Sequence, residues 1–217
     1  TVHEKVRDQC MYRKLSEEAL INLMETGIRE FADKGFDKAS IAAIAKKADL
    51  SAGVIYNYFE GKDDFFLQCV RHSLQPLANL MREIEFHQDD LKKDIELILR
   101  TMFRYTSEHS DYFVMYHEIT SGGCRKFAGE LADEIEAITA GVYYGLIEDA
   151  RQQGRVRQDM NPALFAFFFD NLLMMLHFSY SCDYYKRRLQ VFCRGIPDEE
   201  ELIQELLKFL TGALDLK

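Results

Sequence analysis

The fold is decided by two adjacent short stretches, IAAIAKKAD at residues 41–49 and LSAGVIYNYF at residues 50–59. Ser40 and Ser51 are suitable N-caps, so the stretches predict two short helices over 41–48 and 52–59. Asp49 begins the tight turn between them, because Asp tolerates the left-handed conformation better than most residues. Two short helices joined by such a turn and packed on a longer helix make a helix-turn-helix. The spacing alone is compatible with DNA binding and with a generic three-helix bundle.

A longer helix precedes these two. Apolar residues recur at steps of three and four between Ser16 and Lys34, which predicts one helix with a single buried face. Ser16 is a suitable N-cap, and Gly35 suits the position just past the helix end.

Helical periodicity continues to the end of the chain, and no strand alternation persists. We expect further helices over residues 63–86, from 89 through Phe103, over 111–120, 127–153, 163–189 and 197–211. Pro76 lies inside the first of these and predicts a kink or a break there. Asn161 and Pro162 are a strong helix start. The sequence therefore predicts an all-α protein.

The charge is distributed unevenly. The 217 residues contain 27 Lys and Arg against 36 Asp and Glu, a net charge of −9. Residues 1–62 hold ten basic and ten acidic side chains, so the whole deficit lies in 63–217. This balance argues against a protein that coats nucleic acid indiscriminately or binds a membrane surface through basic residues. We call residues 1–62 the head and residues 63–217 the body. A neutral head joined to an acidic body is compatible with specific DNA binding.

Other classes of protein find little support. The five cysteines form no Cys-x-x-Cys pair and no zinc spacing with His, so we expect no metal site and no cofactor. The first 14 residues are polar and resemble no signal peptide, and the apolar run Ala163–Phe178 falls short of a membrane span. We therefore expect a cytoplasmic protein. His117-Glu118 lacks a second His four residues on, and no phosphate loop or nucleophile elbow is present, so we expect no enzyme.

The head resembles the tetracycline-repressor (TetR) family over about residues 17–67. The resemblance rests on IREFADKGF at 28–36, on Ser40-Ile41 with IAKKA at 44–48, and on LSAGVIYNYF at 50–59 followed by Gly61-Lys62 and Asp64. A Gly-x-Ile-Tyr-x-Tyr-Phe run before a Lys is rarely seen outside this family. Two positions depart from the usual pattern: Asp49 stands where Gly is common, and Val54 where Thr is common.

The resemblance implies a homodimeric, ligand-responsive transcription factor that binds double-stranded operator DNA and is usually a repressor. It implies a DNA-binding head at 1–62, with an arm at 1–15 and a core at 16–62. The body at 63–217 would bind a small hydrophobic or aromatic effector and dimerise through the helices 127–153 and 163–189. An isologous interface of that kind matches a palindromic operator.

On this interpretation the helix at 52–59 enters the major groove with its N-terminal end toward the bases. Val54 would contact a thymine methyl, and Asn57 an adenine edge or a phosphate. The hydroxyls of Ser40, Tyr56 and Tyr58 and the ammonium of Lys62 would bind phosphates. The candidate DNA-binding residues are Ser40, Ser51, Ala52, Gly53, Val54, Tyr56, Asn57, Tyr58 and Lys62. Lys46 and Lys47 fit the solvated surface equally well.

Aromatic and Met side chains are frequent beyond residue 60, which suits an adaptable apolar pocket and equally an ordinary core. The candidate effector residues are Tyr105, Tyr112, Phe113, Tyr116, His117, Phe169, Met174, His177 and Phe178. An alternative is a regulator controlled by a protein partner without a small-molecule effector. A cavity of about 300 Å³ or more would favour the ligand, and a collapsed core the partner.

Overall fold

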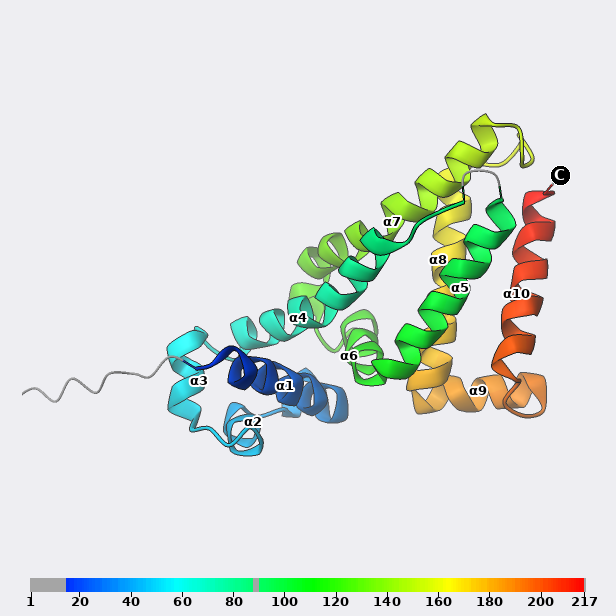
Figure 1. Ribbon diagram of the computed structural model, residues 1–217. Helices are drawn as coiled ribbons and strands as arrows, with labels where there is room; N and C mark the ends of the chain where they lie inside the picture. Colours follow the sequence, from blue (N-terminus) through cyan, green and yellow to red (C-terminus); the bar gives the residue numbers. More distant parts are fainter. Residues whose placement is uncertain (1–14, 88–89, 217) are drawn as a thin grey trace, which may run out of the picture.

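The computed structural model describes residues 15–87 and 90–216, and all regular elements within these ranges are helices (Figure 1). The head contains α1 (Glu17–Lys38), α2 (Ile41–Lys47) and α3 (Ala52–Tyr58). α4 (Lys62–Glu83) runs from the head into the body. The body continues with α5 (Leu91–Glu108), α6 (Ser110–Thr120), the 3-10 helix η1 (Arg125–Phe127), α7 (Ala128–Gln152), α8 (Pro162–Ser181), α9 (Asp183–Cys193) and α10 (Glu199–Leu214). The predicted all-α fold is confirmed.

The predicted stops and turns of the head are present. The Ser16 side chain accepts a hydrogen bond from the Ala19 amide at 3.2 Å and caps α1. Gly35 has a φ of 72° and interrupts the helical conformation, so the first regular stretch ends where the sequence predicted. Asp49 has a φ of 58°, as its place in the turn requires. Ser40 and Ser51 occupy N-cap positions, but neither side chain makes a capping hydrogen bond.

Pro76 neither ends nor breaks α4, which continues through it to Glu83. A proline in a helix leaves carbonyl groups of the preceding turn without their usual donors. Here the Tyr105 hydroxyl of α5 donates to the Ser73 carbonyl at 3.2 Å and supplies a donor in that turn. A neighbouring helix therefore compensates part of the disturbance. The predicted start at Asp89 lies outside the described residues, and Asp90 caps α5 by accepting from the Lys93 amide.

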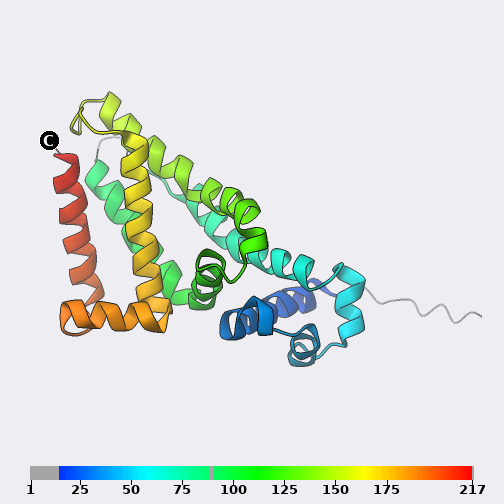
Figure 2. The same cartoon turned by 180° about the vertical axis from the view of Figure 1, so that it is seen from behind.

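The predicted helix over 163–189 is wrong as a single helix. Asn161 and Pro162 start α8 as expected, but Cys182 adopts an extended conformation with φ −111° and ψ 130°. α9 then begins at Asp183 and lies across the end of α8 (Figure 2). The composition changes at the same point from an apolar run to DYYKRRLQ, and Asp183 suits the first turn of a new helix.

α8 is also longer than the apolar run that the sequence indicated. Its 20 residues, with a hydropathy of 1.3, are sufficient by length and composition alone to cross a membrane. A core helix of a water-soluble protein meets the same criterion. α8 packs against α5, α6, α7 and α9, and its buried residues Ala166, Phe169 and Leu173 belong to the core of the body.

The head and the body share one of the two hydrophobic cores. The first core joins α1, α2 and α3 to residues that follow Lys62, including Phe65 and Phe66 of α4, Met115 of α6 and Phe127 of η1. The second lies between α5, α7, α8 and α10. Interhelical packing in the first is close, since a Cβ at Gly27 of α1 would lie 2.7 Å from the Cys69 sulfur.

An ion-pair cluster fixes α2 against α1. The Glu30 side chain is fully buried, and its two carboxylate oxygens each accept a hydrogen bond at 2.6 Å, one from Lys34 and one from Lys47. These hydrogen bonds lower the pKa of Glu30. Lys47 is therefore tied to α1 by this ion pair, although, like Lys46, it is exposed to solvent.

Candidate functional site

The candidate DNA-binding residues lie on α3 and at the starts of α2 and α4. Ile55 and Phe59 are buried under α3, which directs the rest of this short helix outward. Tyr56 is 57% exposed, and Asn57 on the next position is exposed as well. Ser40, Ser51 and Gly53 are exposed, and Ala52 and Val54 are half-buried. The structure thus presents a polar and aromatic helix surface that is free to meet a groove.

Two of the candidates have partners within the chain. The Tyr58 hydroxyl accepts a hydrogen bond from the Leu15 amide, so this side chain fastens the start of α1 to α3. Lys62 donates to the Asp37 carbonyl at 3.1 Å, and its ammonium lies 4.6 Å from the centre of the Phe36 ring. Their roles toward phosphate stay predictions, and both side chains also hold the head together.

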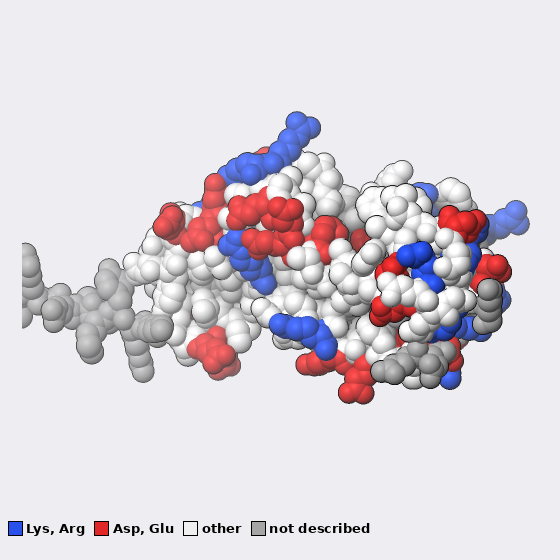
Figure 3. All heavy atoms as spheres, turned by 90° about the horizontal axis from the view of Figure 1, so that it is seen from above, with Lys and Arg blue, Asp and Glu red and all other residues white. Residues whose placement is uncertain are grey.

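The surface carries no broad positive region on the face drawn in Figure 3. Among the described residues of that face, Lys and Arg side chains stand singly between Asp and Glu. Among the ion pairs of the described residues, Arg71 is paired with Glu130 and with Glu134 at 2.7 Å. Residues 1–62 carry equal numbers of basic and acidic side chains, so we expect DNA binding through few phosphate contacts and a modest dependence on salt. The weakly basic arm at 1–14 lies outside the described residues.

The body contains a cavity of about 70 Å³ between α4, α5, α6, α7 and α8. Six of the nine candidate effector residues line it, namely Tyr105, Tyr112, Phe113, Tyr116, Met174 and His177. The volume is below the roughly 300 Å³ of an ordinary ligand site. Met102, Met115 and Met174 are among the lining side chains, and Met changes rotamer readily.

The other three candidates lie outside the cavity lining. His117 packs edge to face with Phe178 and Tyr185, with distances between ring centres of 5.1 Å and 5.4 Å. Phe178 is 2% exposed and belongs to the interior. Phe169 packs against Tyr143 at 4.9 Å in the core of the body. These residues occupy the packing role that the sequence left open for them.

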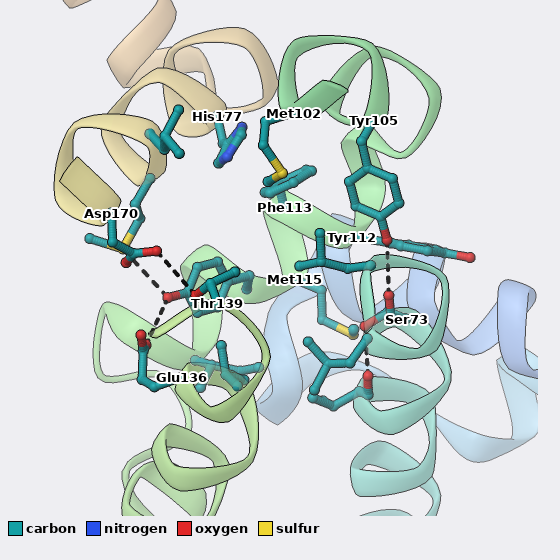
Figure 4. Close-up of a pocket in the computed structure, with 18 of the residues that line it drawn as sticks. Ser73, Met102, Tyr105, Tyr112, Phe113, Met115, Glu136, Thr139, Asp170 and His177 are labelled. Atoms are coloured by element: carbon teal, nitrogen blue, oxygen red, sulfur yellow. Dashed lines mark hydrogen bonds between the residues drawn. The ribbon is translucent and has the colours of Figure 1, made fainter. Parts of the chain in front are cut away.

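Several lining residues were not among the candidates. α4 contributes Val70, Ser73, Leu74 and Leu77, and α7 contributes Ile135, Glu136, Thr139 and Tyr143. The signal in α7 was the spacing of Glu136, Thr139 and Tyr143 at i, i+3 and i+7, which places them on one helix face. Asp170 of α8 faces the same side of the cavity (Figure 4).

One lining residue reaches the head directly. The Tyr112 hydroxyl of α6 donates to the Glu25 carboxylate of α1 at 2.5 Å. Glu25 also lies 3.0 Å from Nε2 of His72 on α4. Burial, together with this carboxylate, raises the pKa of Tyr112. The wall of the cavity and the first helix of the head are therefore joined by a hydrogen bond.

His177 is a buried titratable group of the lining. It is 6% exposed, it stacks on Phe113 at 4.4 Å, and its Nδ1 lies 2.5 Å from the Thr106 hydroxyl. Burial lowers the pKa of His177 to about 3, so its imidazole is neutral at physiological pH.

This burial predicts a pH-dependent stability. Between about pH 3 and 6.5 the unfolded chain binds a proton at His177 that the folded chain does not, so the free energy of unfolding falls as the pH falls. We expect His177→Gln to reduce that dependence by up to about 1.4 kcal/mol per pH unit. Urea unfolding at fixed protein concentration measures it. The two proteins should share one slope above pH 7, and parallel curves below pH 6 would contradict the assignment.

A helix-turn-helix head with an outward short helix, joined to a helical body with an internal apolar cavity, defines a DNA-binding transcriptional regulator. Residues 23–69 match the family model described as "Bacterial regulatory proteins, tetR family". This match, together with the relatives and solved structures below, supports a transcriptional regulator of the TetR family rather than an enzyme.

Relatives and solved structures agree with this. The fatty acid metabolism regulator protein of Bacillus subtilis is 20% identical over 148 residues, which cover 66% of this chain and 74% of that protein. Alignments with four further curated regulators cover only 32% to 48% of those proteins. The fatty acid degradation regulator FadR from Bacillus halodurans has a TM-score of 0.67 at 16% identity, covering 94% of this chain and 100% of its own. FadR from Bacillus subtilis in complex with stearoyl-CoA has a TM-score of 0.66 at 16% identity, covering 88% and 97%. At these identities the structures show the fold.

Proposed function

We propose that the protein is a dimeric repressor whose head, residues 1–62, binds a palindromic operator and is released when an apolar molecule occupies the cavity of the body, residues 63–217. α3 would enter the major groove, with the candidate residues of α2, α3 and α4 in the roles given above. Such a regulator acts in the cytoplasm, where its operator lies.

The observation that carries the proposal is the position of α6 between cavity and head. On one side α6 supplies Tyr112, Phe113 and Tyr116 to the lining. On the other it packs against α1, where Tyr112 binds Glu25 and the Glu118 carboxylate lies so close to Gly35 that a Cβ there would be 2.8 Å from it. A molecule that displaces α6 would move α1 and with it the spacing of two heads on DNA.

Exposed apolar side chains support dimerisation through α7 and α8. Leu164, Phe167 and Phe168 on α8 are 54%, 60% and 58% exposed, and Tyr144 on α7 is 45% exposed. Isolated apolar residues are normal on a surface, but a cluster on two adjacent helices marks an interface. A second copy that packs on it isologously would bury both helices in a four-helix arrangement.

Two of the similar proteins support an apolar effector. One is named for fatty acid metabolism, and another solved structure of the same fold holds stearoyl-CoA. An apolar, chain-like molecule would suit the Leu, Met and aromatic side chains of the lining, provided that Met102, Met115 and Met174 change rotamer to enlarge the cavity of about 70 Å³. The small volume of about 70 Å³ also favours a second function, in which a protein partner controls the head without a small molecule.

The DNA-binding role is tested with Tyr56→Ala. We expect this protein to bind operator and unrelated DNA roughly fivefold to tenfold more weakly, because one exposed hydroxyl and ring leave the backbone contact. Fluorescence anisotropy at fixed salt, with a palindromic fragment from the DNA that flanks the protein's own gene, measures both affinities.

Val54→Thr on the same helix is the matched comparison. It should change the ranking of operator variants while leaving the affinity for unrelated DNA as it is, since Val54 is assigned to a base contact. Undiminished affinity of the Tyr56→Ala protein for the operator would refute the orientation of α3.

A further inference from the structure

One wall of the cavity carries two carboxylates. Glu136 extends from α7 at the exposed rim, and Asp170 extends from α8 beside it and is half-buried (Figure 4). Asp170 accepts a hydrogen bond from the Thr139 hydroxyl at 3.2 Å. Among residues 15–87 and 90–216, the one hydrogen-bond partner of the Glu136 carboxylate is the Tyr116 hydroxyl, at 3.5 Å.

These carboxylates lack a positive partner. Among the described residues, no Lys, Arg or His lies within ion-pair distance of either, although both Lys and Arg pair with acids elsewhere in the chain. Burial raises the pKa of Asp170, and burial together with Asp170 raises the pKa of Glu136. A carboxylate that is partly removed from water and has no cation nearby is costly, so a positively charged group at this wall would stabilise Asp170 most and Glu136, at the rim, less.

A second, independent feature belongs to the same lining. Tyr143 of α7 lines the cavity, is 1% exposed, and its hydroxyl has no hydrogen-bond partner among the described residues. Buried tyrosine hydroxyls usually find a partner. This one can accept a hydrogen bond from a ligand, and the rings of Tyr143, Tyr116 and Phe113 offer aromatic surface to a cation.

The rest of the lining is apolar or already satisfied. Val70, Leu74, Leu77, Met102 and Ile119 provide hydrocarbon surface. Across the cavity, the Tyr105 hydroxyl is bonded to the Ser73 carbonyl, and His177 is neutral (Figure 4). No lining residue carries a positive charge that would hold the carboxylate or phosphate of an anionic ligand.

We propose that the cavity takes an apolar molecule bearing a single cationic nitrogen, an alkyl- or arylalkyl-ammonium, with the nitrogen between Glu136 and Asp170 and the hydrocarbon against α4, α5 and α6. The Tyr143 hydroxyl accepts one of its hydrogen bonds. This inference rests on the cavity being the effector site of the proposed function. It also separates this chain from the relative named for fatty acid metabolism, because the carboxylate of a fatty acid would meet two carboxylates in this cavity.

The experiment compares three probes of equal chain length by calorimetric titration of the full chain, each below its micelle-forming concentration. Decylammonium carries a positive charge, decan-1-ol none and decanoate a negative one. We expect saturable binding of decylammonium, roughly tenfold or more tighter than decan-1-ol, with decanoate weakest, because charge-assisted hydrogen bonds exceed neutral ones.

Charge-neutral variants identify the wall. Glu136→Gln with Asp170→Asn in one protein should weaken decylammonium by roughly tenfold or more and leave decan-1-ol unchanged. Asp133→Asn is the matched control, since Asp133 lies on the same helix one turn earlier and is exposed. Circular dichroism and thermal unfolding verify that each variant is folded.

Four outcomes would overturn the inference. Decanoate or decan-1-ol binding as tightly as decylammonium would leave the cavity as effector site but remove the cationic preference. Decylammonium binding that is unaffected in the double variant would place it elsewhere. Binding of Ca²⁺ or Mg²⁺ that the double variant abolishes, without amine binding, would assign the carboxylates to a metal. Failure of all three probes to bind would count against the cavity itself and so against the proposed function.

Discussion

Phe31→Ala is expected to lower the free energy of unfolding by about 3–5 kcal/mol. Phe31 is 1% exposed and lies at the centre of the first core, with ring centres 4.9 Å from Phe66, 6.0 Å from Phe65 and 6.2 Å from Phe36. Its removal leaves a cavity that helices from both head and body would have to close. Chemical unfolding at fixed protein concentration measures the change, because the stability of a dimer depends on concentration.

Phe209→Ala is the control for that substitution. Phe209 on α10 is 62% exposed, so the same chemical change should shift the unfolding free energy by no more than about 0.5 kcal/mol. Equal losses in the two variants would mean that the aromatic cluster of the head contributes no more than a surface residue.

Gly27→Leu is expected to lower the free energy of unfolding by about 3 kcal/mol. A Cβ at Gly27 would already lie 2.7 Å from the Cys69 sulfur and 2.7 Å from the Phe65 ring, so any side chain forces α1 and α4 apart. The gain in helix propensity from replacing glycine, about 1 kcal/mol, is too small to offset this.

Gly212→Leu on α10 tests the propensity effect alone. A Cβ at Gly212 would have no atom within 4 Å, and the position is exposed. We expect this variant to be slightly more stable than the natural chain. The opposite signs of the two glycine substitutions distinguish close helix packing from backbone entropy, and a stabilised Gly27→Leu protein would disprove the close approach.

Local backbone chemistry made much of the fold predictable. Gly35 and Asp49 adopt positive φ, and Asn161 caps α8, because each conformation depends on the residue itself and its immediate neighbours. No glycine or proline lies next to the break at Cys182, and the local signal for it is the change from apolar to polar residues at Asp183. Pro76 did predict a disturbance of α4. The Tyr105 hydroxyl, 29 residues further along the chain, donates to the Ser73 carbonyl near that proline, and no local sequence pattern predicts such a contact.

The cavity was only partly predictable for a similar reason. The aromatic content of α5 and α6 predicted Tyr105, Tyr112 and Phe113 as lining residues, because large apolar side chains on these helices pack toward the interior of the body. Which side of a helix faces a cavity depends on its rotation against its neighbours, and periodicity alone does not fix that. His117 and Phe178 consequently turned out to pack against each other, while Glu136 and Thr139 of α7 face inward.

Because the first core is shared between head and body, the head cannot be replaced by that of another protein without disturbing the body. A chimaera spliced after Lys62 would separate Phe31 and Phe36 from Phe66 and Phe127, and native partners would meet foreign surfaces at the most densely aromatic point of the molecule. A transplant that keeps α4, η1 and α6 together with the head would preserve the whole core. If α3 reads the bases as proposed, point substitutions on α3 should alter DNA specificity with less damage to the core than the graft of a whole head.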